Sequence, residues 1–344
     1  MILNQDTRQH HLNSYFVYEH RIRNPYVYLN REIKNECNMK KKEKDIRVEM
    51  VRVEGDFAPL VKVNYMDKNA EERSALMVLD SCSTINVLSS EIANNIGTLC
   101  KKNNDNDNII TSTNTIVSLN CAVFSFAIDG EQFREPFHVN DCHLPNIKGD
   151  IPIIGILGNK FLMMHHLVID YSDFSIHTSN ANSGNLSISD CDYFVPMGYG
   201  LVYYGIPLLA MIQGGKQIFT MADTGASFNI IAKQTISDNG FKCHYLKETD
   251  SIYGIGGAET EAEDAIVNFK LETLIGEDGS VDEVSHCSQF KVIPHYIYTL
   301  PQGSCDKNGA LLPPIEAIIC SPFMAKEGWA LDFGAKIIYK RKAE

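Results

Sequence analysis

Short runs in which apolar and polar residues alternate recur along the chain from about residue 45 onward. The run at residues 59–64, Pro-Leu-Val-Lys-Val-Asn, has the two-residue period of a strand with one buried face. Between such runs, Asp129-Gly130 predicts a hairpin turn, and residues 91–97 predict a short helix that ends at its glycine. The pattern therefore predicts an all-β fold, built mostly of strands with short helices.

The same order of runs occurs twice. Asp80 and Asp223 each follow an apolar, β-prone run, at an offset of 143 positions (223 − 80 = 143). Residues 331–333, Leu-Asp-Phe, repeat residues 169–171, Ile-Asp-Tyr, at an offset of 162 (331 − 169 = 162). A repeated order at such spacing indicates a tandem duplication, and the larger second offset predicts an insertion near residues 301–314.

The two copies define the expected domain organisation. A first unit is expected at residues 45–180 and a second at 188–344, joined by a linker at 181–187 in a Ser-, Asn- and Gly-rich stretch. Residues 1–44 have a different character, with a basic cluster at Lys40–Lys42. They are expected to form an N-terminal arm, and the alternative is an inhibitory pro-segment.

Composition limits the partners that are expected. The chain has 344 residues, of which 44% are hydrophobic, enough for two cores. Its net charge of −12 argues against nucleic acid as a partner. Residues 1–20 lack the apolar centre of a signal peptide, and Asn159, Lys160 and His165 interrupt the apolar run 151–169, so no membrane span is expected. The compartment stays open: cytoplasmic, or exported if a signal was removed.

The ten cysteines and the neighbouring histidines do not predict a metal site. No Cys-x-x-Cys pair occurs, and the Cys-His neighbours lack the spacing of zinc ligands. The thiols are interpreted as mostly reduced, and a disulfide-bonded exported chain is the alternative. We expect no metal and no cofactor.

The candidate chemistry lies where the two apolar runs end. We call Asp80–Ser83 the first corner and Asp223–Ala226 the second corner. Gly225 permits a backbone path that is closed to other residues, and Thr224 carries a hydroxyl that can lock the loop. Each aspartate lies among apolar neighbours, where two carboxylates brought together would share one proton.

The stretch Asp223-Thr224-Gly225-Ala226-Ser227 resembles the signature of retropepsin-like aspartic proteases, and the resemblance extends over about residues 45–339. It implies two retropepsin-like lobes in a pepsin-like arrangement, with Asp80 and Asp223 as the catalytic pair in an inter-lobe cleft. The activity implied is hydrolysis of a peptide or protein substrate by general acid–base activation of a water. A monomer would suffice for the site.

The resemblance also assigns supporting roles to the corners. It implies that the hydroxyls of Ser81 and Thr224 bridge the two corners. Ser83 would steady the Asp80 carboxylate, which Ala226 at the matching place cannot do. The Ile-Leu-Gly run at 156–158 would support the first corner from below.

A glycine-rich stretch in the second half resembles a substrate-covering flap. It consists of Tyr253, Gly254, Ile255, Gly256 and Gly257. Glycines suit a hairpin tip that moves and approaches the backbone of a ligand. Its counterpart at residues 111–114 contains no glycine, so one working flap is expected.

Two cysteines depart from the family pattern. Cys82 stands where the first corner would have glycine, and Cys320 stands where the second support run would have it. These departures keep open an alternative function, a catalytically silent peptide-binding module that uses the same cleft. Cys82 also raises the hypothesis that oxidation beside the aspartates disturbs the site.

Overall fold

The computed structural model describes residues 46–53, 56–96, 99–100, 108–110, 116–118, 120–140, 151–179, 190–199, 206–253, 259–275, 280–295, 297 and 315–342. Strands dominate these residues, so the prediction of a mostly β fold is confirmed. The helices are short: α3 (Ser90–Ile96), α4 (Asn159–Met164), α5 (Lys233–Asn239) and α6 (Ser321–Glu327). The expected arm, linker and insertion, at residues 1–44, 181–187 and 301–314, lie outside the described residues.

Two local predictions are met by the backbone. α3 coincides with the helix predicted at residues 91–97. The turn between β9 (Asn120–Ile128) and β10 (Glu131–Val139) places Asp129 at φ 51° and Gly130 at φ 78°. Positive φ at both central residues is what a tight hairpin turn requires, and Asp-Gly adopts it at low cost.

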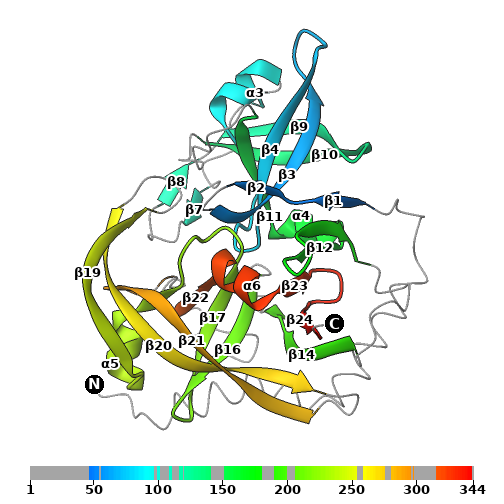
Figure 1. Ribbon diagram of the computed structural model, residues 1–344. Helices are drawn as coiled ribbons and strands as arrows, with labels where there is room; N and C mark the ends of the chain where they lie inside the picture. Colours follow the sequence, from blue (N-terminus) through cyan, green and yellow to red (C-terminus); the bar gives the residue numbers. More distant parts are fainter. Residues whose placement is uncertain are drawn as a thin grey trace, which may run out of the picture.

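The first half of the chain forms a sheet that has eight strands in its described part (Figure 1). Their spatial order is β2 (Val51–Val53), β3 (Asp56–Met66), β4 (Glu72–Asp80), β11 (Ile153–Gly158), β5 (Val87–Leu88), β10 (Glu131–Val139), β9 (Asn120–Ile128) and β6 (Leu99–Cys100). A separate pair consists of β7 (Asn108–Ile110) and β8 (Ile116–Ser118). β4 lies inside the sheet, which is why its last six residues are all buried.

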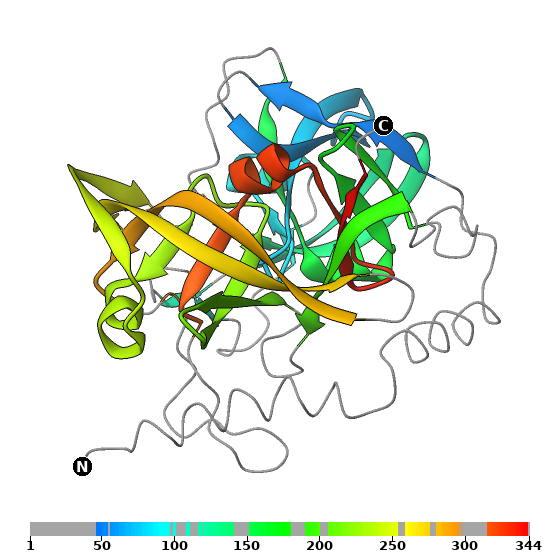
Figure 2. The same cartoon turned by 60° about the horizontal axis from the view of Figure 1, so that its bottom comes forward.

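The second half contributes most of a larger sheet, with fourteen strands among the residues described. Its main order is β1 (Arg47–Glu49), β13 (Ser175–Thr178), β12 (Leu167–Asp170), β23 (Trp329–Asp332), β24 (Ile337–Arg341), β14 (Cys191–Pro196), β20 (Glu259–Ile275), β21 (Ser280–Ile293), β18 (Ile230–Ala232), β22 (Ala317–Cys320), β17 (Lys216–Asp223), β16 (Pro207–Gln213) and β15 (Gly198–Tyr199). β19 (Cys243–Tyr253) pairs with β20. Figure 2 shows β20 and β21 as a long twisted pair that crosses the molecule.

The strand pairing around each aspartate is the same in both halves. β4 pairs in parallel with β11, β11 is antiparallel to β5, and β5 is parallel to β10. β17, β22, β18 and β21 repeat this sequence of parallel, antiparallel and parallel pairings. Parallel neighbours require a crossover between them, so a repeat of this pattern at matching positions has the form expected of a duplicated unit.

The two copies meet on a local two-fold axis. β12 pairs antiparallel with β23, and Ile169 lies opposite Leu331, the position that the offset of 162 makes its equivalent. On either side, Val168 faces Asp332 and Asp170 faces Ala330. The offset of 162 makes Val168 equivalent to Ala330 and Asp170 equivalent to Asp332, so a two-fold rotation exchanges the two facing pairs. β13 and β1 continue the sheet on one side, and β24 and β14 continue it on the other.

A large apolar cluster connects the halves. It includes Leu79 beside the first corner, Ala222 beside the second and Trp329 of β23, all 0% exposed. The indole nitrogen of Trp329 donates to the Tyr193 hydroxyl at 2.9 Å, so the buried N–H is satisfied. In the described part of the chain, no helix has the length and apolar character needed to cross a membrane.

Candidate active site

Each aspartate is the last residue of a buried central strand. Asp80 ends β4 and lies in register with Gly158 of β11. Asp223 ends β17 and lies in register with Cys320 of β22. The apolar run before each aspartate lies between neighbouring strands. We call β11 and β22 the support strands, and each aspartate lies at the same position relative to its support strand.

Two buried hydroxyls connect the corners directly. The Ser81 amide donates to Thr224 Oγ1, and the Thr224 amide donates to Ser81 Oγ, both at 2.9 Å. Thr224 Oγ1 in turn donates to the Leu79 carbonyl at 2.7 Å, and Ser81 Oγ donates to the Ala222 carbonyl at 2.6 Å. Both side chains are 0% exposed, so these reciprocal bonds fix the corners against each other without competition from water.

The carboxyl groups of Asp80 and Asp223 lie close enough for each to shift the pKa of the other. A hydrogen bond between them requires a proton, because two ionised carboxylates are acceptors only. Gly225 makes the approach possible: a Cβ at this position would lie 2.7 Å from both Cγ and Oδ2 of Asp80. The sequence predicted Gly225 for its backbone freedom, but the structure requires it because the Asp80 carboxyl packs directly against it.

The Asp80 carboxylate is held by main-chain donors. The amides of Cys82 and Ser83 both donate to its Oδ1 at 2.8 Å. The predicted role of Ser83 is wrong in one respect, since its hydroxyl donates to the Ile85 carbonyl at 2.7 Å and not to Asp80. A turn that aims the Ser83 amide at the carboxylate leaves the side chain directed along the loop.

The Asp223 carboxyl has one close main-chain donor and one weaker one. The Gly225 amide donates to its Oδ1 at 2.9 Å. Ala226 offers no side-chain donor, as predicted. Its amide donates to the Asp223 main-chain oxygen at 3.3 Å and interacts only weakly with the carboxyl.

Both carboxyls hold a proton more tightly than free aspartic acid does. Burial raises the pKa of Asp223 well above its usual value, and the charge of Asp80 raises it further. Burial also raises the pKa of Asp80, but its hydrogen bonds from Cys82 and Ser83 oppose this rise. The pair is therefore suited to share one proton.

This shift predicts a pH dependence of stability. Above the pKa of an unfolded aspartate, about 3.9, the folded state keeps a proton on Asp223 that the unfolded state has lost. The Asp223 contribution is therefore full below pH 3.9 and is lost as pH rises through the raised pKa, with a slope of at most about 1.4 kcal/mol per pH unit. The test is urea unfolding of Asp223→Asn and wild type between pH 4 and 7. The free energy of unfolding of Asp223→Asn minus that of wild type should increase as the pH rises.

The matched control is Asp192→Asn, which removes an exposed carboxylate. Its stability over the same pH range is the reference for the loss of one exposed carboxylate. A difference between Asp223→Asn and wild type that is flat with pH would contradict a raised pKa at Asp223.

The Cys82 thiol lies beside the pair. It donates to the Ala222 carbonyl at 3.5 Å, and burial together with the charges of Asp223 and Asp80 raises its pKa well above the usual range. A protonated thiol is a poor nucleophile toward oxidants. The hypothesis of an oxidation-sensitive site at Cys82 is therefore weakened.

Sequence reasoning missed two asparagines that fix the support strands to the corners. Asn86 Oδ1 accepts from the Gly158 amide, and Asn229 Oδ1 accepts from the Cys320 amide, both at 2.9 Å. These residues are themselves separated by the offset of 143 (229 − 86 = 143). An alignment of the two halves residue by residue would have found them.

The predicted flap begins where the described backbone stops. β19 and β20 remain paired to Tyr253 and Glu259, and residues 254–257 lie outside the described residues. Below this hairpin, Ile252 packs on the same apolar cluster as Cys82 and Ala226. The base of the hairpin therefore shares its packing with both corners.

A buried ion pair links this hairpin to the loop after the second corner. Lys291 Nζ lies 3.0 Å from Asp264 Oδ2 and 3.4 Å from Asp250 Oδ2. The same ammonium lies 5.4 Å from the centre of the exposed Phe228 ring. The Lys291 amide donates to the Asn229 carbonyl at 2.8 Å, so the contacts run from the hairpin to the corner.

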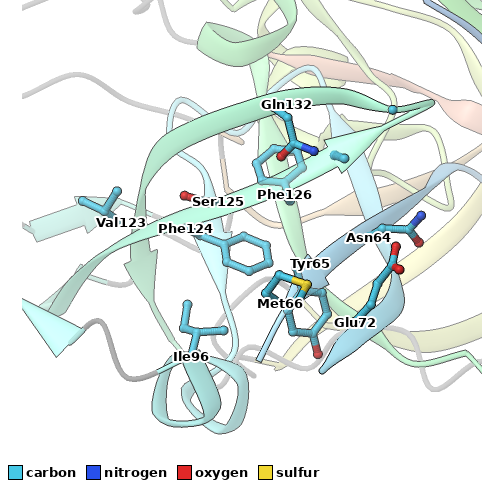
Figure 3. A pocket seen from close by; sticks show the side chains of 12 residues that line it. Asn64, Tyr65, Met66, Glu72, Ile96, Val123, Phe124, Ser125, Phe126 and Gln132 are labelled. Carbon is cyan, nitrogen blue, oxygen red and sulfur yellow. The ribbon is translucent and has the colours of Figure 1, made fainter. Parts of the chain in front are cut away.

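A surface pocket lies away from the aspartates (Figure 3). Its volume is about 330 Å³, and its lining comes mainly from β3 and β9. Figure 3 shows Met66, Glu72 and Ile96 around it, none of which belongs to either corner. Among the described residues, no group of three or more His, Cys, Asp or Glu is placed to hold a metal ion.

Comparisons with known proteins give distant similarities. No family model and no curated protein matches the chain. Among solved structures it is similar to basic 7S globulin from soybean, with 10% identity and a TM-score of 0.46 over 88% of this chain and 95% of that one. Conglutin gamma, a basic 7S globulin from lupine seeds, gives 10% identity and a TM-score of 0.46 over 88% and 96% of the two chains.

At this identity and TM-score neither globulin informs the activity of this chain. The resemblance to retropepsin-like proteases remains a hypothesis, and function has to be argued from the geometry of the two corners.

Proposed function

We propose that this protein is an aspartic endopeptidase. It would hydrolyse a peptide bond of a substrate that is bound between the side chains of Asp80 and Asp223. The observation that carries the proposal is that both carboxyls lie against Gly225, although they come from strands in separate halves of the chain. The reciprocal bonds of Ser81 and Thr224 support it, because they hold the corners in one relative position. Such preorganisation is what acid–base chemistry on a bound water needs.

The mechanism follows from one shared proton. The ionised carboxylate takes a proton from a water that attacks the scissile carbonyl carbon, while the protonated carboxyl donates to the carbonyl oxygen. The substrate would lie extended below the β19–β20 hairpin, with Tyr253 to Gly257 closing over it as a flap. We expect two lobes, at residues 45–180 and 188–344, with the substrate in the cleft between them. The repeated strand pairing supports this organisation.

A second function is favoured by one specific observation. Cys82 brings a side chain to the position that glycine occupies in the second corner, beside both carboxyls. A displaced carboxyl pair would bind an extended peptide without cleaving it. The second candidate is therefore a catalytically silent peptide-binding module that uses the same cleft.

One experiment separates these functions. Wild type and Asp80→Asn are incubated with a peptide library between pH 3 and 8, and both cleavage products and retained intact peptides are measured by mass spectrometry. New termini in wild type that are absent in Asp80→Asn would support the endopeptidase. Intact peptides retained equally by both proteins, without new termini, would overturn it and support the binding module.

A further inference from the structure

The two corners differ at two positions that the duplication makes equivalent. The first corner has Cys82 where the second has Gly225, at the offset of 143. The support strands differ in the opposite sense, with Gly158 in the first half and Cys320 in the second, at the offset of 162. These four residues lie beside Asp80 or Asp223. The surroundings of the two carboxyls are therefore not symmetric.

The first difference acts on how each carboxyl packs against the opposite corner. Asp80 packs on Gly225 so closely that a Cβ there would lie 2.7 Å from its Cγ. Cys82 places a Cβ at the matching position in the first corner, which denies Asp223 the same packing. The exposure of the two residues follows this difference, since Asp80 is 6% exposed and Asp223 is only partly buried.

The second difference acts on the loop that supplies amide donors. A Cβ on Gly158 would lie 2.4 Å from the Ser83 carbonyl oxygen, so the first loop packs tightly over this glycine. Cys320 has a Cβ at the equivalent place, and the second loop therefore lies farther from its support. The amide after Cys320, on Ser321, is 3.1 Å from the Ala226 carbonyl. The equivalent distance in the first half, from the Asn159 amide to the Ser83 carbonyl, is 2.8 Å.

The amide donors are correspondingly unequal. Asp80 Oδ1 receives the amides of Cys82 and Ser83 at 2.8 Å. In the second corner the Ala226 amide, equivalent to that of Ser83, donates to the main-chain oxygen of Asp223 at 3.3 Å, and it interacts with the Asp223 carboxyl only weakly. Amide donors favour the ionised form of a carboxyl, so the first corner, with two close amides, stabilises an anion better than the second corner does.

We propose that Cys82 and Cys320 are positioning residues that assign the two roles: Asp80 is the ionised carboxylate that activates water, and Asp223 is the acid. The assignment rests on the proposed function and deepens it. In the first step, Asp80 takes a proton from water as the water oxygen bonds to the carbonyl carbon, and Asp223 gives its proton to the carbonyl oxygen. In the second step, Asp80 passes its proton to the leaving nitrogen, and Asp223 recovers a proton from the intermediate hydroxyl as the C–N bond breaks.

The titratable groups that face Asp223 in the described structure are consistent with this assignment. They are Asp80 on β4, Cys82 after it and Cys320 on β22. Burial raises the pKa of Cys320 to about 12, and burial also keeps Cys82 protonated. Neither thiol contributes a charge, so each cysteine acts through its shape.

The test is a ¹³C NMR titration of carboxyl-labelled aspartate, which requires no turnover. Wild type, Cys82→Gly, Cys320→Gly and the double glycine variant are titrated, with Asp80→Asn and Asp223→Asn used to assign the signals. Wild type should ionise first at Asp80. The double glycine variant should ionise Asp223 about one pH unit lower than wild type does, a tenfold change in proton affinity.

Alanine variants are the matched controls, because Cys82→Ala and Cys320→Ala remove the thiol and keep the Cβ. They should titrate as wild type does. Unchanged Asp223 titration in the glycine variants, or an equal change in the alanine variants, would overturn the proposal. Each single glycine variant carries part of the shift, so failure of the double variant to fold leaves the test intact.

Failure of this assignment is distinguishable from failure of the proposed function. A protein that cleaves no peptide but shows the expected titration keeps the assignment and loses the endopeptidase. A protein that cleaves peptides and shows unchanged titration keeps the endopeptidase and loses the role of the cysteines.

Discussion

Asp223→Asn is expected to lower kcat/KM for a cleaved peptide by about 10²–10⁴-fold, which is about 3–5 kcal/mol of transition-state stabilisation. Asparagine keeps the size of the side chain and its contact with Gly225, but it neither gives nor accepts the catalytic proton. The measurement is the initial rate on a fluorogenic peptide, chosen from sequences that wild type cleaves, over pH 3 to 8.

Two further variants make this prediction specific. Asp192→Asn removes an exposed carboxylate away from both corners and should retain wild-type rates. The double variant Asp80→Asn/Asp223→Asn should be about as slow as either single variant. The two residues act as one unit, so either single substitution already removes the activity of the pair. Activity of Asp223→Asn within fivefold of wild type would place the chemistry elsewhere.

Thr224→Val is expected to destabilise the fold by about 2–4 kcal/mol. Valine has the shape of threonine but leaves the Ser81 amide without its acceptor and the Leu79 carbonyl without the threonine hydroxyl. Each buried polar group that loses its partner costs about 1–3 kcal/mol. Urea unfolding of Thr224→Val beside Thr224→Ser measures the effect, because serine keeps the hydroxyl.

A double-mutant cycle with Ser81→Ala extends this test to the whole bridge. The two hydroxyls serve reciprocal bonds, so loss of one loosens the geometry on which the other depends. The double variant should therefore be more stable than the sum of the single losses predicts, by about 0.5–3 kcal/mol. Equal stability of Thr224→Val and Thr224→Ser would show that the bridge contributes little.

Local sequence pattern was enough for several features because they depend on nearest neighbours. The alternation at residues 59–64 identifies β3, and the Asp129-Gly130 pair identifies the turn between β9 and β10. The apolar runs before Asp80 and Asp223 identify buried central strands, since a strand covered on both faces has no polar face to show.

Other features depend on groups far apart in the sequence. The Ser83 hydroxyl was expected at Asp80 but bonds to Ile85, because the turn decides which donor faces the carboxylate. The Lys291–Asp264 pair joins neighbouring strands of the second half and has no sequence motif. The flap residues 254–257 lie outside the described structure, so their predicted role stays a prediction.

The sequence by itself determined that two similar strand-rich units each end a buried strand in an aspartate. It did so because period, apolar runs and glycine positions are local properties of the chain. Only the tertiary structure decided that the two carboxyls meet and that they are unequal. The reciprocal bonds of Ser81 and Thr224 hold the two corners together, and these residues lie far apart in the sequence. The inequality that we propose depends on Cys82 and Cys320, whose effect is felt only in the assembled corners.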